Sequence, residues 1–239
     1  MKFRLGLNRY ICSRKYFSNV KKPKIKFDDI SENFWNNKTP EIENMCGVGE
    51  LNNEDLVHSE RIFKNLKVNR KFNRALDVGA GIGRITFNVL YDKCNKIDLL
   101  DNNKKFLNHA ELKQREIKGD KIENFYHSKI QNFRFQYNYD LIFVQWVLEY
   151  LDEKNFALFI SNISSHLNNE GYVIIKENIN LDNELNIPIE EEGSLIRPNK
   201  TFENCFRIAG LKSIHEELVE YESLPIEILD VKCCVLSKL

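Results

Sequence analysis

The sequence lacks three features that would each assign it to a familiar class of protein. No apolar run in its 239 residues approaches the roughly 20 residues that cross a bilayer. The six cysteines include no C-x-x-C pair, and the five histidines are scattered, so the spacing of a structural zinc site is missing. These absences predict no membrane association, no metal site, and cysteines that are reduced thiols inside a cell, with Cys233 and Cys234 buried in an apolar terminal strand.

Acidic residues are absent from residues 1–27, which carry nine of the 35 Lys and Arg residues. This composition is typical of a targeting segment, and Arg14 to Ser18 resembles a mitochondrial presequence cleavage site; a solvated basic tail is the alternative. The rest of the chain then holds 26 basic and 35 acidic residues, a net charge of −9. An acidic body favours a cationic partner and disfavours nucleic acid, whose phosphates it repels.

The chain also lacks the G-x-G-x-x-G spacing of dinucleotide-binding domains. Its glycines stand instead at alternate positions, Gly79, Gly81 and Gly83, between a short apolar run and a helical pattern. Glycine permits a tight turn and close approach of the backbone to a ligand, and the helix that follows offers free N–H groups. Asp77, just before the turn, suits a cationic cofactor and would repel a pyrophosphate.

A second predicted strand, Lys96 to Leu100, ends at Asp101, 22 residues after Gly79. A carboxylate at the tip of the second strand accepts hydrogen bonds from neighbouring ribose hydroxyls. The strand, glycine turn, helix and acid together predict a nucleoside site at the carboxyl edge of a parallel sheet. This combination resembles the class I methyltransferases that use S-adenosylmethionine.

Strands and helices alternate along most of the remaining chain, which predicts an α/β fold. We expect a class I methyltransferase (Rossmann-like) sheet, mostly parallel, with helices on both faces and an antiparallel pair near 211–218 and 230–236. Residues 28–239 should form one domain, with an N-terminal helical layer at about 28–68. A polar, acidic loop is expected up to about Asn199, followed by a helix capped by Thr201.

Several segments together resemble a named family, the α-N-terminal protein methyltransferases, which modify Xaa-Pro-Lys/Arg N-termini. The segments are L-D-V-G-A-G-I-G-R-I-T (76–86), V-Q-W-V (144–147), I-I-K-E-N (174–178), E-G-S (192–194) with Arg197, A-G-L (209–211) and L-P-I-E-I (224–228). The resemblance covers roughly residue 34 to the C-terminus. It implies an N-methyltransferase whose partner is the N-terminal peptide of a protein, basic after the proline, and a location in the cytoplasm or nucleus unless residues 1–27 direct it elsewhere.

The resemblance implies S-adenosylmethionine as cofactor. Its implied contacts are Gly79, Gly81, Arg84, Asp101, Ile130, Gln131 and Gln145. Arg84 would pair with the cofactor carboxylate, as a guanidinium can do with two hydrogen bonds. Ile130 and Gln131 would flank the adenine, and Gln145 would contact the methionine part.

The resemblance also implies how the peptide would bind. Trp146 would pack on the proline ring, Trp35 would help to wall the channel, and Asn178 would fix the peptide backbone. Glu227 and the acids Glu190 to Glu192 would receive the basic third residue.

The chain departs from the family at two positions that serve the attacking amine. Tyr150 stands where the family has a histidine, and Glu192 is the nearest match to its aspartates. Tyrosine, with an unperturbed pKa of about 10, is a poor base at neutral pH, whereas a free α-amine titrates at about 7.7–8.0 and is already partly neutral. The implied catalytic set is therefore Glu192, Asn178 and Tyr150, with Glu192 as proton acceptor.

Other functions stay open at this point. The same fold could methylate a small molecule or another protein site, or bind the cofactor without catalysis. A nicotinamide dehydrogenase is disfavoured by the glycine spacing.

Overall fold

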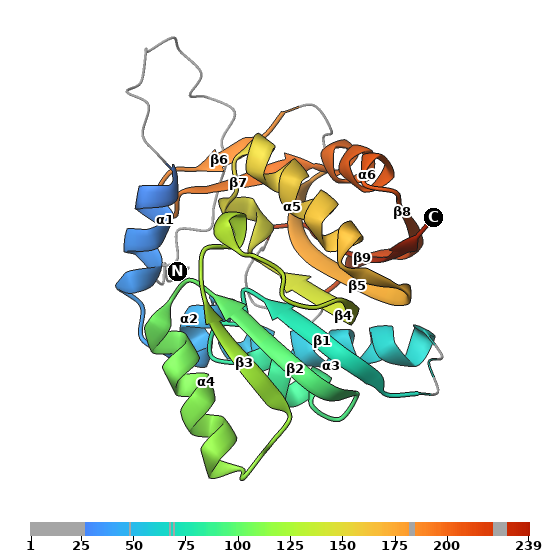
Figure 1. The fold of residues 1–239 in the computed structure, drawn as a ribbon. Helices are drawn as coiled ribbons and strands as arrows, with labels where there is room; N and C mark the ends of the chain where they lie inside the picture. The colour runs from blue at the N-terminus through green and yellow to red at the C-terminus, as the bar shows by residue number, and fades with distance from the viewer. Residues whose placement is uncertain (1–26, 48, 67, 69, 182–184, 222–228) are drawn as a thin grey trace.

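The computed structural model describes residues 27–239 except 48, 67, 69, 182–184 and 222–228. Residues 1–26 lie outside the described part, so the targeting segment stays a prediction. Within the described part, nine strands form one mixed sheet (Figure 1). No helix described here is long and apolar enough to cross a membrane.

The centre of the sheet is parallel, as predicted. Its strands are β1 (Phe72–Val78), β2 (Cys94–Asp101), β3 (Ile122–His127), β4 (Tyr139–Gln145) and β5 (Leu167–Asn180). They lie in the order β3-β2-β1-β4-β5, each parallel to its neighbours. Because β2 and β3 lie on one side of β1 while β4 and β5 lie on the other, the strand order reverses between β1 and β4, where ligands bind in open α/β sheets.

An antiparallel pair completes the sheet, which confirms the predicted strand arrangement. β9 (Val231–Lys238) runs antiparallel to β5, and β8 (Leu211–Val219) runs antiparallel to β9. Cys233 and Cys234 are buried in β9 as free thiols, in agreement with the predicted burial.

The acidic segment after β5 is not the continuous loop that the sequence predicts. β5 continues to Asn180, and β6 (Ile187–Ile189) pairs with β7 (Ser194–Pro198) in a hairpin whose turn includes Gly193 at φ +64°. The hairpin forms because Ile196 and Arg197 are buried, while the charged residues between the two strands stay at the turn. The two short strands were not predicted because three consecutive glutamates stand between them.

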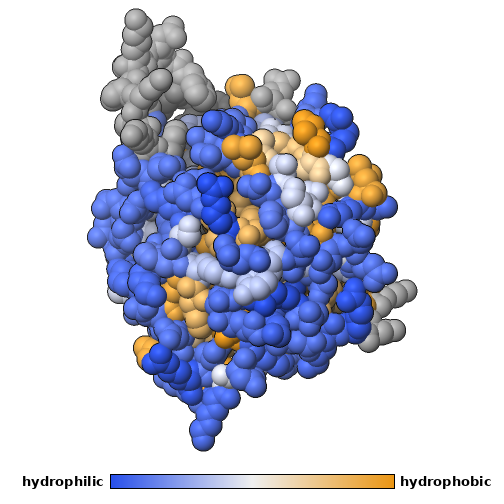
Figure 2. All heavy atoms as spheres, viewed as in Figure 1, coloured by the Kyte–Doolittle hydropathy of each residue, from blue (hydrophilic) through white to orange (hydrophobic). Residues whose placement is uncertain are grey.

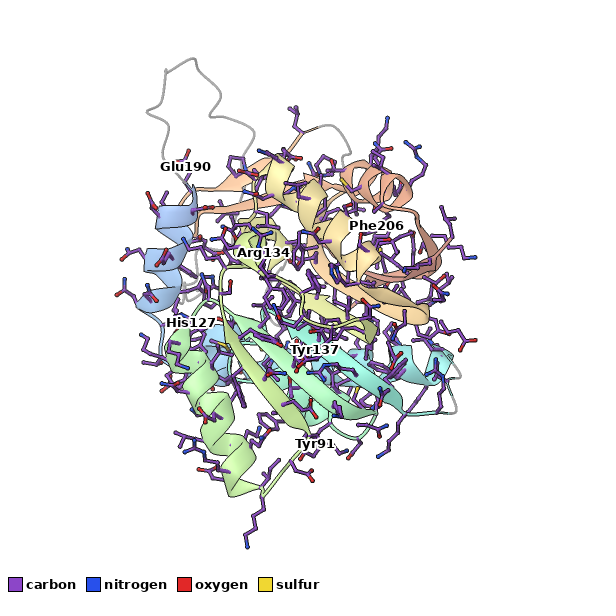
Figure 3. The ribbon with its side chains drawn as sticks, in the orientation of Figure 1. Tyr91, His127, Arg134, Tyr137, Glu190 and Phe206 are labelled. Carbon is purple, nitrogen blue, oxygen red and sulfur yellow. The ribbon has the colours of Figure 1, made fainter. Side chains whose placement is uncertain are left out.

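Helices cover both faces of the sheet (Figure 1). They are α1 (Phe27–Asn36), α2 (Ile42–Cys46), α3 (Gly49–Leu66), α4 (Lys104–Glu116), α5 (Glu153–Ser165), α6 (Asn199–Ile208) and the short turns η1 (Thr86–Leu90), η2 (Ile130–Asn132) and η3 (Leu148–Tyr150). One core contains Ile62 of α3, Val89 of η1 and Leu107 of α4, and the other contains Phe156 of α5 and Phe206 of α6. Phe206 is labelled in Figure 3.

Polar side chains define where two helices begin. Asn103 accepts hydrogen bonds from the backbone N–H groups of Lys105 and Phe106 at the start of α4, and Asp152 accepts one from Asn155 at the start of α5. The predicted cap at Thr201 is wrong: α6 begins at Asn199, and Thr201 lies within it. The surface shown in Figure 2 is mostly hydrophilic, with small separate apolar areas.

Candidate active site

A cavity opens at the carboxyl edge of the sheet, at the point where the strand order reverses. It holds about 1140 Å³, including the space at its open mouth. Ten of the residues predicted from the sequence line it: Trp35, Gly79, Gly81, Arg84, Asp101, Ile130, Gln131, Gln145, Trp146 and Tyr150. The structure thus gathers residues from seven separate elements and turns into one pocket.

The glycine turn after β1 forms the floor of this pocket. Gly79 and Gly81 have φ values of +71° and +56°, a region that side chains disfavour. A Cβ atom at Gly79 would lie 2.8 Å from the Cβ of Val147, and real Cβ atoms do not approach that closely. Glycine is therefore required here both by the backbone angle and by the loop after β4.

Asp101 projects into the pocket from the end of β2. Its Oδ2 accepts the N–H of Gly81 at 2.8 Å, and its Oδ1 accepts that of Asn103 at 2.7 Å. Burial raises the pKa of Asp101, and these N–H groups oppose that rise. The two hydrogen bonds fix the carboxylate in place. Each oxygen can accept a further hydrogen bond, so the group can still bind two ligand hydroxyls.

Asp77, the acid before the glycine turn, lies in a different environment from Asp101. Asp77 accepts a hydrogen bond of 2.5 Å from the hydroxyl of Thr86, and burial raises its pKa to about 6. Asp77 lines the cavity behind the glycine backbone. Its carboxyl group therefore tethers β1 to η1.

A buried network that the sequence did not predict lies behind the pocket wall. Asp55, from α3, is fully buried and pairs with Arg84 at 2.6 Å and with Lys176 at 2.5 Å. It also accepts hydrogen bonds from Gln145 Nε2, at 2.9 Å, and from Tyr221 Oη, at 3.1 Å. Burial alone would raise the pKa of Asp55, but the charges of Lys176 and Arg84 hold it below its ordinary value. One carboxylate from α3 thus orients both Arg84 and Gln145.

Gln145 and Trp146 form the wall at the end of β4. Gln145 is 8% exposed, and its Oε1 has no hydrogen-bond partner among the described residues, although its Nε2 is held by Asp55. Trp146 has φ +51°, and its backbone N–H donates to the carbonyl of Lys176 at 3.1 Å. A buried acceptor without a partner is uncommon in proteins and indicates a ligand donor here.

Aromatic rings close the other side of the pocket. Trp35 of α1 meets Tyr150 edge to face, with 5.9 Å between ring centroids, and meets Phe106 at 6.3 Å. Its backbone carbonyl accepts a hydrogen bond of 2.9 Å from Asn103, the residue that caps α4. Gln131 also donates a hydrogen bond of 3.2 Å to Asp28 of α1, so the N-terminal helix is fixed across the cavity.

Glu149 is a pocket residue that the sequence analysis missed. It lines the cavity, is 5% exposed, and accepts a hydrogen bond of 3.0 Å from Asn178 Nδ2. Behind it, Glu177 Oε1 accepts the backbone N–H groups of Val147 and Leu148, both at 2.8 Å. The available signal was an acid two residues after Q-W-V and directly before Tyr150.

Three of the described residues predicted for the substrate or for catalysis do not line this cavity. Asn178 lies behind Glu149, as its hydrogen bond shows. Glu190 and Glu192 lie at the turn of the β6–β7 hairpin, and Figure 3 labels Glu190 there. Glu227 falls outside the described residues. Among the described residues, no group of three or more potential metal ligands occurs.

Comparisons with known proteins agree with one another. A family profile described as AdoMet dependent proline di-methyltransferase matches residues 23–237. The N-terminal Xaa-Pro-Lys N-methyltransferase 1-A of Xenopus laevis is 30% identical, over 86% of this chain and 93% of that protein. The Alpha N-terminal protein methyltransferase 1 of Arabidopsis thaliana is 30% identical, over 85% of this chain and 77% of that protein. A solved SAM-dependent methyltransferase from Leishmania major has a TM-score of 0.78 and 26% identity, over 88% of this chain and 83% of that chain.

Proposed function

Because the chain belongs to the family of α-N-terminal protein methyltransferases, we propose that its pocket holds the α-amino group of a Xaa-Pro-Lys protein N-terminus beside the methyl donor. The protein is an S-adenosylmethionine-dependent protein N-terminal methyltransferase. The observation that carries this conclusion is the family match over residues 23–237, which includes every residue that lines the cavity.

The residues present fit S-adenosylmethionine. Asp101 keeps acceptor capacity for two ribose hydroxyls after binding two backbone N–H groups. The unpartnered Oε1 of Gln145 is an acceptor suited to the amino group of the methionine part. Gly79 and Gly81 bring bare backbone to the same space. When bound, the cofactor would supply an electrophilic methyl group, which a neutral amine nitrogen would attack while the bond between the methyl carbon and sulfur breaks.

We assign the remaining cofactor contacts by their place in the cavity. Ile130 and Gln131, on η2, line the same cavity as Asp101 and would flank the adenine. Arg84 lies beside the glycine turn, where a cofactor carboxylate can approach it even though Asp55 already pairs with one face of its guanidinium. The five N–H donors of a guanidinium allow both partners.

The substrate side of the pocket is aromatic. Trp146 offers a flat face for a proline ring, and Trp35 and Tyr150 wall the opposite side. Such rings exclude water and restrict the peptide, so that the amine is presented in one orientation. Most of the rate enhancement then comes from alignment, for which effective molarities of about 10⁵ M or more are known.

Acids outside the cavity would receive the basic third residue. Glu190 is exposed at the hairpin turn, and Glu192 is half-buried beside it. A lysine that follows the proline extends away from the reacting amine, toward residues at the rim. We infer that Glu190 and Glu192, with Glu227, provide this charge, and that Asn178 acts through its contact with the pocket wall.

Two peptides that differ in one residue test this proposal. Ser-Pro-Lys and Ser-Pro-Glu peptides are incubated with the protein and labelled cofactor, and methylation is measured by mass spectrometry. The lysine peptide should be methylated and the glutamate peptide should react much more slowly, since each charge-assisted contact contributes about 1.5–3 kcal/mol. Equal turnover of both peptides would reject the acidic rim as the specificity determinant.

A further inference from the structure

Among the carboxylates that line the cavity, Glu149 is one to which the cofactor contacts assign no role. Glu149 lies on η3, between the tryptophan at the end of β4 and Tyr150, and all three residues line the same cavity. It is 5% exposed. A carboxylate buried this far in a protein loses water contacts, and polar groups must compensate for that loss.

Polar contacts fix the backbone that carries Glu149. The carboxyl group of Glu177 accepts the N–H groups of Val147 and Leu148, each at 2.8 Å. From β7, Arg197 Nη1 donates to the carbonyl of Leu148 at 2.9 Å. The turn therefore holds Glu149 rigidly against the cavity, as is required of a group that must meet a reacting atom.

A side chain of β5 contacts the Glu149 carboxylate directly. Asn178 donates a hydrogen bond of 3.0 Å to its Oε2. Titratable groups near this turn include Glu177 of β5 and Arg197 of β7, and Asp28 of α1 lines the same cavity. Burial, and then the charge of Glu149, raises the pKa of Glu177 to about 8. The negative charge beside it and its own burial therefore favour the protonated form of Glu177.

The proposed function supplies a cation for this carboxylate. A peptide α-amine with a pKa of about 7.7–8.0 arrives mostly as an ammonium group at neutral pH, and must lose a proton before it can attack. Glu192, the acceptor predicted from the sequence, lies at the hairpin turn and does not line the cavity. Glu149 lies in the wall beside Trp146, where the first residues of the peptide would enter.

We propose that Glu149 binds the α-ammonium group of the substrate and accepts its proton. The N–H bond breaks with its electron pair left on nitrogen, and the proton forms an O–H bond on the Glu149 carboxylate. The amine is then neutral and free to react, and the proton passes to solvent before the next transfer. Asn178 is a positioning residue that orients Glu149. This role rests on the proposed function, because that function provides the ammonium group.

A pH series with matched variants tests this role. Methylation of Ser-Pro-Lys is measured from pH 6.5 to pH 9 for the wild type, Glu149→Gln, Glu192→Gln and Glu116→Gln, the last being an exposed control at the end of α4. Glutamine keeps the size and the acceptor oxygen that meets Asn178. Thermal unfolding and calorimetric cofactor binding confirm that each variant is folded and binds the cofactor.

The expected signature is a defect that depends on pH. Glu149→Gln should be at least about 100-fold slower than wild type at pH 6.5, the usual range for a lost general base. At pH 9, where most of the amine is already neutral, the defect should shrink to about fivefold or less. Glu192→Gln should show a ratio that does not change with pH, and Glu116→Gln should match the wild type.

Different failures have different meanings. A defect of Glu149→Gln that is the same at every pH would mean that Glu149 only supports the wall, and would overturn the proposal. A pH-dependent defect in Glu192→Gln alone would mean that Glu192, at the hairpin turn, accepts the proton, and would also overturn the proposal. If the wild type methylated no N-terminal peptide at any pH, the proposed substrate would be wrong, and the role of Glu149 would be rejected with it.

Discussion

Arg84 and Asp55 form a buried ion pair behind the cofactor pocket, with 2.6 Å between Nη1 and Oδ2. The two residues are 29 positions apart in the sequence and come from α3 and from the turn after β1. Asp55 also holds Gln145 and Lys176. The N-terminal helical layer is therefore bound to the glycine turn by charge as well as by packing.

Removal of Asp55 should lower the free energy of unfolding more than removal of an exposed acid does. In Asp55→Ala, Arg84 and Lys176 would both stay buried without their partner, and such a change typically costs about 3–5 kcal/mol. Urea unfolding should show this loss in the free energy of unfolding. Asp120→Ala, at an exposed site, is the control and should change it by less than about 0.5 kcal/mol. A loss as small as the control's would mean that the network does not stabilise the fold.

Cofactor affinity should depend on Asp101. In Asp101→Ala, both ribose hydroxyls would lose a charged acceptor, so binding should weaken by about 1.5–3 kcal/mol, or roughly 10- to 150-fold in Kd. Isothermal titration calorimetry with S-adenosylmethionine or its demethylated product measures this directly. The same Asp120→Ala variant should bind like the wild type. Unchanged affinity in Asp101→Ala would place the ribose elsewhere.

Trp146 should select for proline at the second residue of the substrate. In Trp146→Ala, the proline ring loses an apolar contact, worth about 25 cal/mol for each Å² of apolar surface that stays exposed, so KM for Ser-Pro-Lys should rise. The preference for Ser-Pro-Lys over Ser-Ala-Lys should fall at the same time, while calorimetric cofactor affinity changes little. If the variant kept the wild-type preference, the proline ring would have to lie on another surface.

Glu177 should make the stability of the protein depend on pH. Its folded-state pKa is raised to about 8 by burial and by the charge of Glu149, so the folded state binds its proton more tightly than the unfolded state does. Its contribution is therefore fully present below its ordinary pKa of 4.5, and is lost as pH rises toward 8.

Glu177→Gln isolates this effect. Glutamine can still accept the N–H groups of Val147 and Leu148 and has no charge to lose. Chemical unfolding at pH 5 and at pH 8 should show a smaller decline in the free energy of unfolding for Glu177→Gln than for the wild type. An identical decline in both proteins would mean that Glu177 is ionised throughout this range.

The parts of the fold and of the site that are predictable from sequence are local ones. Gly79 and Asp101 could be predicted because the glycine turn and the strand-end acid occur at fixed places in one strand–turn–helix–strand unit. The β6–β7 hairpin did not, because its apolar residues are few and stand among glutamates. The hairpin becomes evident only in the folded structure, where Ile196 is buried and pairs with Ile187 on the neighbouring strand.

Contacts between distant segments explain what the sequence could not predict about the pocket. Asp55 looks like any polar residue of an amphipathic helix, and nothing in its neighbours indicates three partners from β4, β5 and the glycine turn. Glu149 sits beside a recognisable motif, but its burial follows from Asn178, nearly 30 residues later. Ion pairs and hydrogen bonds between residues that are far apart in the sequence produce no periodic pattern from which they could be predicted.

The most direct test of the central claim is to locate the methyl group on the substrate. The wild-type protein is incubated with labelled S-adenosylmethionine and a Ser-Pro-Lys peptide, and fragment ions assign the modified nitrogen by mass spectrometry. An otherwise identical peptide with an acetylated N-terminus is the control. We expect label on the α-nitrogen of the free peptide and none on the acetylated one. Label on the lysine side chain, or equal labelling of both peptides, would contradict it.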